Sequence, residues 1–376
     1  MTTAPAPPLD AASVVSADLA QMGNLLEAEF RLLKGSRLLI TGGAGFLGYY
    51  LVQAVLWWND QALGEPVSVT LLDNFMRGEP PWLGRLSQRD DVSLVTHDIR
   101  RPLPPTISGF DYTVHAAGIA SPHVYRRYPI ETMDANVNGL RFLLDAAHAQ
   151  GERGHRVRGF LFYSSSEIYG DPVPEAIPTP ETYRGNVSCT GPRACYDESK
   201  RYGETLAVNF AHQYGIPISI ARPFNNYGPG MKINDGRVIA DFCRAVIEDR
   251  DIIMFSDGRP TRTFCYVADA VIGYFKVLTR GRPGEPYNIG SDGPEVSMAE
   301  LADMVAETGR QLFGYSGHVL LGESSDREYL TDNPNRRCPD LTKARGELDY
   351  APVVDLAEGI RRTLLWYRDN ATVTEE

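Results

Sequence analysis

The fold of this chain is decided by residues 37–48, which read RLLITGGAGFLG. An apolar run of strand length is followed by three glycines, Gly42, Gly45 and Gly48, which open a helical pattern. Glycines at such a turn let the backbone bend sharply, and they let a pyrophosphate approach the N–H groups at the helix N-terminus. The segment therefore predicts a strand, a dinucleotide-binding turn and a helix that begins near Phe46 and Leu47.

A second strand is predicted at residues 67–72, and Asp73 follows it directly. At this distance from the glycines, a dinucleotide fold places an acid on the adenosine ribose hydroxyls. A carboxylate there favours NAD over NADP, because a 2′-phosphate would meet a like charge. We therefore expect NAD as the cofactor, with Asp73 and its neighbour Asn74 in the binding site.

A second motif lies in the middle of the chain, where Tyr196 and Lys200 stand four residues apart. On a helix these positions share one face, so a phenol and an ammonium project together. The ammonium is expected to lower the pKa of the phenol from its ordinary value of ~10 by favouring the phenolate. Such a tyrosine can take a hydroxyl proton while a nicotinamide accepts a hydride.

Strands and helices continue to alternate after Asp73, with further strands predicted at residues 92–96, 112–115, 160–163 and 217–221. This order predicts an α/β fold with a parallel, doubly wound sheet of the Rossmann type. From about residue 223 the pattern becomes mixed, and it closes on an amphipathic helix near residues 355–368. We expect an NAD-binding domain at residues 35–222 and a smaller, mainly substrate-binding lobe at residues 223–376.

Residues 1–34 are predicted to form a tail and an extra helix. The first twelve residues are rich in Ala and Pro and lack the features of a secretory signal, so we expect a disordered tail. Residues 14–33 carry apolar side chains at helical spacing, namely Leu19, Met22, Leu25, Leu26 and Phe30. This apolar face either packs on the chain's own core or forms a dimer contact.

The composition narrows the classes of function. A formal net charge of −11 argues against a nucleic-acid groove, which needs clustered Lys and Arg, so an anionic substrate would be held by local arginines. Five cysteines without C-x-x-C spacing indicate buried, reduced thiols in a cytosolic protein. No apolar run reaches the ~18 residues of a membrane span. We therefore expect a cytoplasmic enzyme that acts on a small molecule.

Taken together, these motifs resemble those of the extended short-chain dehydrogenase/reductases that modify nucleotide sugars. Within that group the chain is most similar to the UDP-glucuronate decarboxylases, also called UDP-xylose synthases. The similarity runs from about residue 35 to about residue 370. It rests on HAAG at residues 115–118, SSSEIYGDP at 164–172, GPRACYDE at 191–198, NDGRV at 234–238, TRTF at 261–264 and RCPD at 337–340.

This resemblance implies roles for further residues. Asp98 and Ile99 would meet the adenine, while Ala116 and Ala117 would line the cofactor. Ser165 would assist Tyr196 as the base. On the substrate side, Tyr125 and Glu167 would surround the sugar, and the uridine diphosphate would be clamped by Arg193, Asn225, Arg237 and Arg262.

The choice among nucleotide-sugar reactions depends on the residues after Ser165. The glucose 4,6-dehydratases carry an Asp-Glu pair here, and Ser166 is too weak an acid to replace the aspartate. The 4-epimerases usually carry a small or apolar residue at the position of Glu167. Decarboxylases carry Thr-Ser-Glu, which this chain matches at two of three positions. GDP-mannose 4,6-dehydratases share Ser-Glu, so this motif alone leaves the reaction open.

Arg337 is the second discriminator. In the decarboxylases, an arginine in an Arg-Lys-Pro segment meets the substrate carboxylate, and Arg337-Cys338-Pro339 stands in that place here. A guanidinium group can bind a carboxylate in a bidentate way, which would fix it for loss of CO2. The neighbouring Arg336 leaves an ambiguity of one residue.

The resemblance thus implies NAD-dependent conversion of UDP-glucuronate into UDP-xylose through a 4-keto intermediate, without a metal. The alternatives are a UDP-glucuronate 4-epimerase, a 4,6-dehydratase and a noncatalytic NAD-binding protein. A homodimer joined by helices of the dinucleotide domain is also implied, with the apolar helix that includes Leu206, Val208 and Phe210 at the contact.

Overall fold

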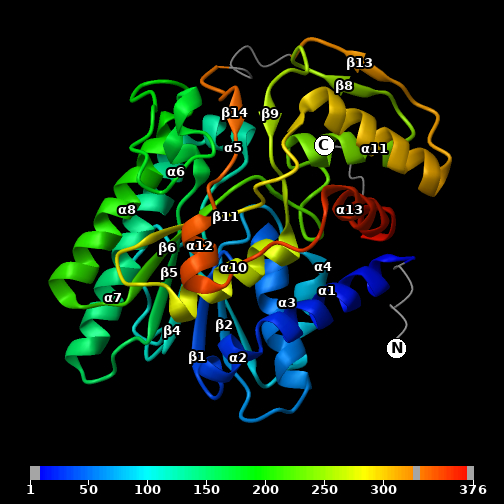
Figure 1. Cartoon of the computed structure of the whole chain (residues 1–376). Coiled ribbons are helices and arrows are strands. Elements are labelled where there is room, and N and C mark those ends of the chain that lie inside the picture. Colours follow the sequence, from blue (N-terminus) through cyan, green and yellow to red (C-terminus); the bar gives the residue numbers. More distant parts are fainter. Residues whose placement is uncertain (1–8, 325–330, 371–376) are drawn as a thin grey trace.

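The computed structural model describes residues 9–324 and 331–370. Its centre is a seven-stranded sheet covered by helices (Figure 1). All neighbouring strands run parallel, which confirms the predicted doubly wound fold. In spatial order the strands are β11 (Pro286–Ile289), β6 (Ile218–Pro223), β5 (Gly159–Tyr163), β4 (Tyr112–His115), β1 (Arg37–Thr41), β2 (Ser68–Asp73) and β3 (Val92–Thr96).

Two helical layers bury the two faces of this sheet. On one face, α7 (Leu140–Glu152) and α8 (Ala194–Tyr214) pack over Phe160, Phe162 and Ile218. On the other, α3 (Phe46–Asp60) and α10 (Val267–Arg280) pack over strand residues such as Ile40 and Leu161. Because both faces are covered, the central strands are almost continuously apolar rather than alternating.

The segments between these elements form short helices, several of which follow the carboxyl ends of the strands. They are α4 (Pro81–Gly84), α5 (Pro122–Arg127) and α6 (Pro129–Asp134), the π-helix η2 (Ala135–Gly139), and the 3-10 turns η1 (Leu86–Gln88), η3 (Ser166–Tyr169) and η4 (Pro174–Ala176). Ligands of doubly wound folds bind at this edge of the sheet.

The chain after residue 223 builds a smaller lobe and also returns to the main sheet through α10 and β11. Its helices are α9 (Val238–Ile247), α11 (Met298–Phe313), α12 (Thr342–Leu348) and α13 (Leu356–Asn370), and the last confirms the predicted closing helix. Its small sheets pair β10 (Cys265–Tyr266) with β7 (Asn226–Tyr227), β13 (Val319–Leu321) with β8 (Ile252–Met254), and β9 (Thr261–Arg262) with β12 (Val296–Ser297) and β14 (Arg336–Arg337).

The N-terminal segment packs on the chain's own core. It forms α1 (Ala11–Leu25) and α2 (Glu27–Leu33), and α1 lies against α3, α10 and α13. Leu19, Met22, Leu26 and Phe30 are buried, whereas Leu25 is 42% exposed. Of the two alternatives for this apolar face, packing on the core is therefore confirmed. The predicted tail is too long, because Asp10 already caps α1; residues 1–8 lie outside the described residues.

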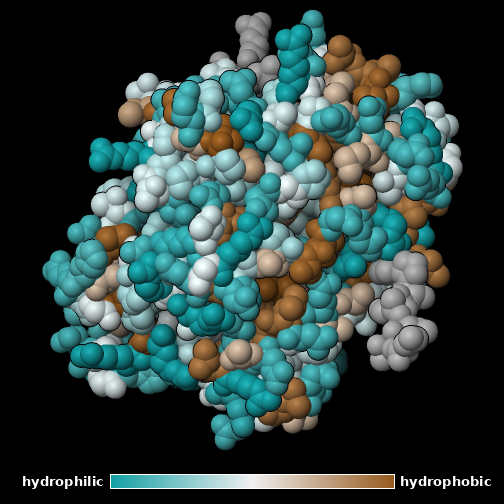
Figure 2. Space-filling model, in the orientation of Figure 1, coloured by the Kyte–Doolittle hydropathy of each residue, from teal (hydrophilic) through white to brown (hydrophobic). Residues whose placement is uncertain are grey.

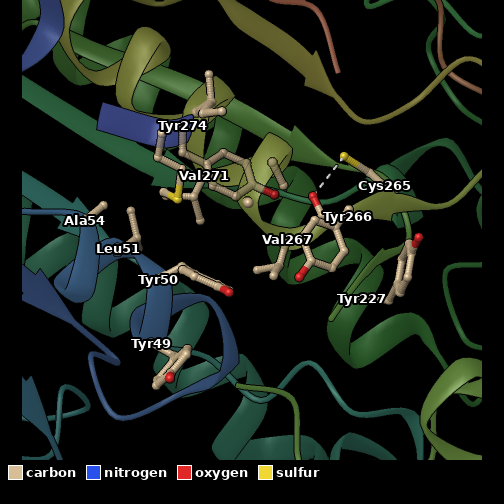
Figure 3. Close-up of a cluster of buried hydrophobic side chains, with 14 of the residues drawn as sticks. Tyr49, Tyr50, Leu51, Ala54, Tyr227, Cys265, Tyr266, Val267, Val271 and Tyr274 are labelled. Carbon is tan, nitrogen blue, oxygen red and sulfur yellow. Dashed lines mark hydrogen bonds between the residues drawn. The ribbon is translucent and has the colours of Figure 1, made fainter. Parts of the chain in front are cut away.

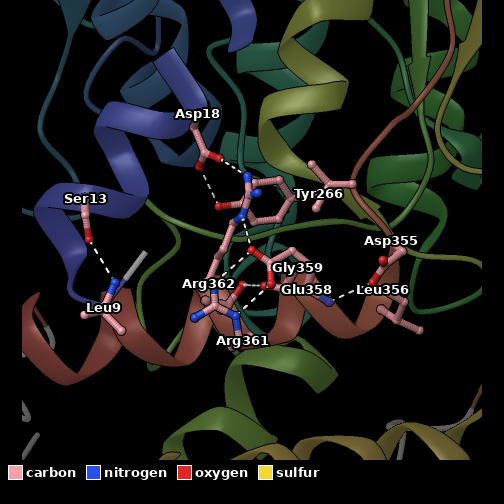
Figure 4. Close-up of polar contacts among 12 residues, drawn as sticks. Leu9, Ser13, Asp18, Tyr266, Asp355, Leu356, Glu358, Gly359, Arg361 and Arg362 are labelled. Atoms are coloured by element: carbon pink, nitrogen blue, oxygen red, sulfur yellow. Dashed lines mark hydrogen bonds and ion pairs between the residues drawn. The ribbon is translucent and has the colours of Figure 1, made fainter. Parts of the chain in front are cut away.

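A buried carboxylate fixes α1 to both parts of the molecule. Asp18 accepts hydrogen bonds from Tyr266 at 2.6 Å and from Arg362 at 2.5 Å (Figure 4). It also accepts one from Tyr50 at 2.5 Å. Tyr50 lies on α3 and points toward Tyr266 and Val267 of the smaller lobe (Figure 3). Through Asp18 the extra helix therefore ties the dinucleotide-binding half to α13.

Hydrophilic residues cover most of the visible face, and apolar side chains gather near β8 and β13 (Figure 2). The exposed large apolar residues in and next to these two strands are Ile253, Phe255, Leu320 and Leu321. Among the described residues, no helix is both long and apolar enough to cross a bilayer. All five cysteines are free thiols, but Cys189 is exposed and Cys195 is only partly buried, so the expectation that all are buried is wrong for these two residues.

Candidate active site

One cavity of about 880 Å³ joins the glycine-rich turn to the Tyr196/Lys200 motif, and we call it the central cavity. Most of the residues predicted from the sequence line it. On the cofactor side these are Gly42, Gly45, Phe46, Leu47, Gly48, Asp73, Asn74, Asp98, Ile99, Ala116 and Ala117. On the reaction and substrate side they are Tyr125, Ser165, Ser166, Glu167, Tyr196, Lys200, Asn225, Arg237 and Arg337.

The glycine-rich turn has the tight geometry that a dinucleotide cradle requires. Gly42 has φ +71°, and a Cβ added there would lie 2.7 Å from the Cα of Ala117. A Cβ at Gly48 would lie 2.2 Å from the carbonyl oxygen of Gly43. No side chain caps the first turn of α3, so its N–H groups face the cavity as an anion-binding end.

The adenosine end of the cavity carries two acids in the predicted places. Asp73 ends β2, and its carboxylate accepts the N–H of Ala44 at 3.0 Å and that of Phe75 at 2.9 Å. Asp98 lies just after β3, and hydrogen bonds from Arg100 lower the pKa of its carboxyl. Both carboxylates line the cavity, so they can accept hydrogen bonds from ribose and adenine.

Tyr196 and Lys200 lie one turn apart on α8 and are both buried. The Lys200 ammonium donates to the carbonyl oxygen of Tyr163 at 2.8 Å, and burial lowers its pKa to about 7. Burial raises the pKa of Tyr196 to about 12, opposed by a hydrogen bond with Ser165. The expected lowering of the tyrosine pKa by Lys200 is wrong for this structure, because desolvation outweighs the effect of neighbouring charges.

Tyr125 lies face to face with Tyr196. The ring centroids are 5.1 Å apart and the ring planes differ by 10°. Tyr125 is 1% exposed, and within the described ranges its hydroxyl has no hydrogen-bond partner. A buried phenol in this situation is suited to donate to a ligand in the cavity.

Glu167 forms the centre of a buried cluster of charges. Both of its oxygens accept from Arg337, at 2.5 and 2.6 Å, and Arg193 pairs with it from the other side. Burial opposes ionisation, but these two guanidinium groups outweigh it and lower the pKa of Glu167. Asp197 lies 3.7 Å behind Arg193, and burial, reinforced by the charge of Glu167, raises the pKa of its carboxyl.

Two of the predicted substrate arginines do not line the cavity. Arg193 lies behind Glu167, and Arg262 donates to the carbonyl oxygens of Pro334 and Asn335, which lead into β14. Of the predicted diphosphate clamp, Asn225 and Arg237 thus face the cavity. At β14, Arg337 lines the cavity, whereas Arg336 pairs with Glu295 outside it at 2.7 Å.

Several residues of this site were missed by the sequence reasoning. Asn136 lies in the π-helix η2 and donates to Ser199 at 2.8 Å, and its Oδ1 would lie 2.8 Å from a Cβ added at Gly118. Arg77 and Asp235 also line the cavity and form an ion pair with each other. Asp235 stands in the NDGRV segment, which could have pointed to it, but the π-helix leaves no mark in the sequence pattern.

The comparisons with known proteins agree with this geometry. The model of the NAD dependent epimerase/dehydratase family matches residues 38–290. UDP-glucuronic acid decarboxylase 1 of Arabidopsis thaliana is 36% identical over 91% of this chain and 72% of its own length. UDP-glucuronic acid decarboxylase 5 of the same plant is 38% identical over 86% of this chain and 87% of its own. Among solved structures, the dTDP-glucose 4,6-dehydratase DesIV of Streptomyces venezuelae, with NAD bound, has a TM-score of 0.75 and 28% identity, covering 89% of this chain and 97% of DesIV.

Proposed function

The chain belongs to the NAD dependent epimerase/dehydratase family, and from that premise we propose that it converts UDP-glucuronate into UDP-xylose and CO2. The observation that carries this proposal is the buried guanidinium group of Arg337, which lines the same cavity as Tyr196 and Lys200. A base for a sugar hydroxyl and a binding group for a carboxylate thus face one space.

NAD is the cofactor of this family, and the glycine-rich turn fits it because the two close approaches leave no room for side chains. When bound, NAD supplies an acceptor for the hydride from sugar C4 and returns that hydride at the end of the cycle. Tyr196 takes the proton of the C4 hydroxyl, with the hydroxyl of Ser165 as its hydrogen-bond partner. The ammonium of Lys200 helps to stabilise the phenolate once the proton has moved.

The resulting 4-keto sugar is a β-keto acid, which loses CO2 because the electron pair left at C5 is delocalised into the C4 carbonyl. Protonation at C5 and return of the hydride then give UDP-xylose. Ser166 and Glu167 position the ring, and Tyr125 contacts the sugar. Asn225 and Arg237 hold the diphosphate from the cavity wall, with Arg193 and Arg262 acting from behind it.

The charge cluster suits a substrate with one carboxylate. The guanidinium groups of Arg193 and Arg337 share the single carboxylate of Glu167, and burial raises the pKa of Asp197 behind Arg193. The cluster can therefore balance the charge of one further carboxylate. Glu167 holds Arg337 in a bidentate way, yet it also has Arg193 as a partner. A substrate carboxylate can therefore take over the fork of Arg337 while Glu167 remains paired with Arg193.

Epimerisation and dehydration would share the oxidation at C4 but would not need a carboxylate held in one place for loss of CO2. Ser166 offers no acid for the loss of a C6 hydroxyl, as a 4,6-dehydratase requires. A 4-epimerase must rotate its 4-keto sugar, and the pairing of Arg337 with a carboxyl group would oppose that rotation. A protein that only bound NAD would have no need for the Tyr196/Lys200 pair.

The test is to incubate the purified protein with NAD and a panel of nucleotide sugars and to weigh the products. We expect turnover of UDP-glucuronate to a product lighter by one CO2. A product of unchanged mass would indicate epimerisation, and a product lighter by one water would indicate dehydration. An absence of turnover with every nucleotide sugar would favour a noncatalytic NAD-binding protein.

We also propose a cytoplasmic homodimer joined through α6 and α8. Ile130 and Met133 on α6 and Tyr202 on α8 are exposed, and these two helices pack side by side. Leu206 and Val208 are only partly buried, whereas Phe210 is packed inside the protomer. Light scattering at micromolar concentration tests this proposal, and a monomeric mass would contradict it.

A further inference from the structure

Two segments from different halves of the molecule meet at the rim of the central cavity. Residues 76–80 follow β2, and we call them the strap; residues 230–235 precede α9, and we call them the latch loop. Every residue of both segments lines the cavity. The strap therefore forms one wall beside the predicted adenosine site, and the latch loop forms another.

Asp235 joins these walls by two ion pairs. Its Oδ2 lies 2.7 Å from the guanidinium group of Arg77 in the strap, and its Oδ1 lies 2.9 Å from Nε of Arg237. The Asp235 side chain is 3% exposed, whereas that of Arg77 is 38% exposed. The Asp235–Arg77 pair thus closes the cavity at its solvent side, while the carboxylate itself is anchored inside.

Further contacts hold the latch loop, and the strap meets this loop at Arg77. The carbonyl oxygen of Asp235 accepts a hydrogen bond from Ser121 at 2.7 Å, which fixes the loop to the start of α5. The strap reaches the loop through Arg77, whose carbonyl oxygen also accepts from Lys232. Since the strap's link runs through a half-exposed arginine, it is the part of this rim that can open.

Arg237 points from the same carboxylate toward the ligand sites. Its guanidinium group lies 5.7 Å from the ring centroid of Phe46, the first residue of α3, and it lines the cavity. A dinucleotide pyrophosphate would lie at that helix start. The Asp235 carboxylate is therefore shared between an arginine that closes the rim and one that faces phosphate groups.

We propose that Asp235 couples cofactor retention to nucleotide binding: through Arg77 it holds the strap closed over NAD, and through Arg237 it responds to a nucleoside diphosphate. The cofactor half follows from the NAD-binding cavity alone, and the diphosphate half rests on the proposed function. A diphosphate that fixes Arg237 fixes Asp235 and hence the strap, so each ligand slows the departure of the other. A retained cofactor is what a cycle needs when the hydride taken in its first step is returned in its last.

The test measures NAD release directly. Protein loaded with NAD and freed of excess cofactor is diluted into alcohol dehydrogenase and ethanol, which reduce released NAD to fluorescent NADH. Arg77→Gln and Asp235→Asn should each speed release about tenfold, since a partly exposed, charge-assisted hydrogen bond is lost. Arg85→Gln is the matched control, because it removes an exposed arginine from the same cavity wall, and its release rate should stay within about twofold of wild type.

The coupling is tested by repeating the measurement with UDP. UDP should slow NAD release from the wild-type protein and should lose this effect in Asp235→Asn. The claim that the strap retains NAD would be overturned if Arg77→Gln and Asp235→Asn both released NAD at the wild-type rate. It would also be overturned if Arg85→Gln released NAD as fast as these two variants. An equal effect of UDP on wild type and Asp235→Asn would overturn the coupling. None of these measurements requires turnover. The proposal about Asp235 can therefore fail or succeed separately from the proposed decarboxylation.

Discussion

The reaction side of the central cavity has two ends. At one, Tyr196 and Lys200 are buried beside neutral groups, and at the other the buried Arg337 forms an ion pair with the partly buried Glu167. We call these the tyrosine end and the arginine end. A single turn serves both, because Ser165 bonds to Tyr196 while Glu167, two residues later, pairs with Arg337. At the tyrosine end, Tyr196 and Lys200 can therefore change protonation state, whereas Glu167 and Arg337 at the arginine end are both ionised.

Because of this difference, substitutions at the two ends should affect activity and the free energy of unfolding differently. At the tyrosine end, burial disfavours the charged forms of both side chains. These two residues therefore lower the stability of the folded protein when they are charged. At the arginine end, removal of one partner leaves a buried charge less well compensated. Substitutions should thus reduce activity at both ends but lower stability mainly at the arginine end.

The largest effect is expected from Tyr196→Phe. In the proposed mechanism the variant loses the base for the C4 hydroxyl, so the turnover number should fall roughly 10⁴-fold, at the upper end of general acid–base effects. NAD binding should remain, because the glycine-rich turn is untouched. Steady-state kinetics and NAD titration measure the two properties. Near-normal turnover would show that Tyr196 is not the base.

The next effect is expected from Arg337→Ala. Loss of the carboxylate partner should lower the rate about 30- to several-thousand-fold. The free energy of unfolding should also fall, because Glu167 keeps only Arg193. Arg336→Ala is the control, since Arg336 is half-exposed and pairs with Glu295 outside the cavity. An equal loss of rate in the two variants would contradict the assignment.

A third prediction concerns stability and pH at the tyrosine end. The pKa of Lys200 is about 7 when folded and ordinarily about 10.5, so between these values the unfolded chain binds more protons and stability rises with pH. From pH 7 to pH 9 the unfolding free energy of wild type should gain about 2–3 kcal/mol relative to Lys200→Met.

Urea titrations at the two pH values measure this gain. The matched control is Lys276→Met, because Lys276 is also buried but lies 3.5 Å from Glu29. Lys276→Met should destabilise the protein, whereas Lys200→Met should stabilise it at pH 7. An equal change in the unfolding free energy of the two variants would contradict the difference between a buried lysine without a carboxylate partner and one paired with Glu29.

The smallest effect is expected from Asp197→Asn. Because the pKa of Asp197 is raised, its carboxyl group is protonated and neutral at low pH and becomes charged as the pH rises. At low pH it therefore carries the same charge as asparagine. The variant should match wild type near pH 6. At pH 8 its KM for UDP-glucuronate should be about threefold lower, because Arg193 then holds Glu167 more firmly and frees Arg337. A higher KM at pH 8 would contradict this arrangement.

Local patterns predicted the fold well. The strand after Gly35 and the strand that ends on Asp73 were found within about one residue, because apolar runs and glycine turns are encoded locally. Asp98 and Ala116 were assigned from the family resemblance, and both line the cavity because parallel strands deliver the residues at their ends to one edge.

Properties that depend on packing were not predictable in the same way. The sequence grouped Arg193 and Arg262 with Arg237, but which arginines face the cavity depends on how Glu167 and the β14 segment pack against them. The pKa of Tyr196 follows from burial, which the spacing to Lys200 does not reveal. The Arg77–Asp235 pair joins residues 158 positions apart, so no local pattern marks it.

The most direct test of the division between the two ends follows the carboxyl carbon itself. UDP-glucuronate labelled with ¹³C at its carboxyl group is incubated with the protein and NAD in D2O, and the gas and the product sugar are analysed together. We predict one labelled CO2 for each UDP-xylose formed, with one deuterium at C5. Retention of the labelled carboxyl group in the product sugar would contradict the account.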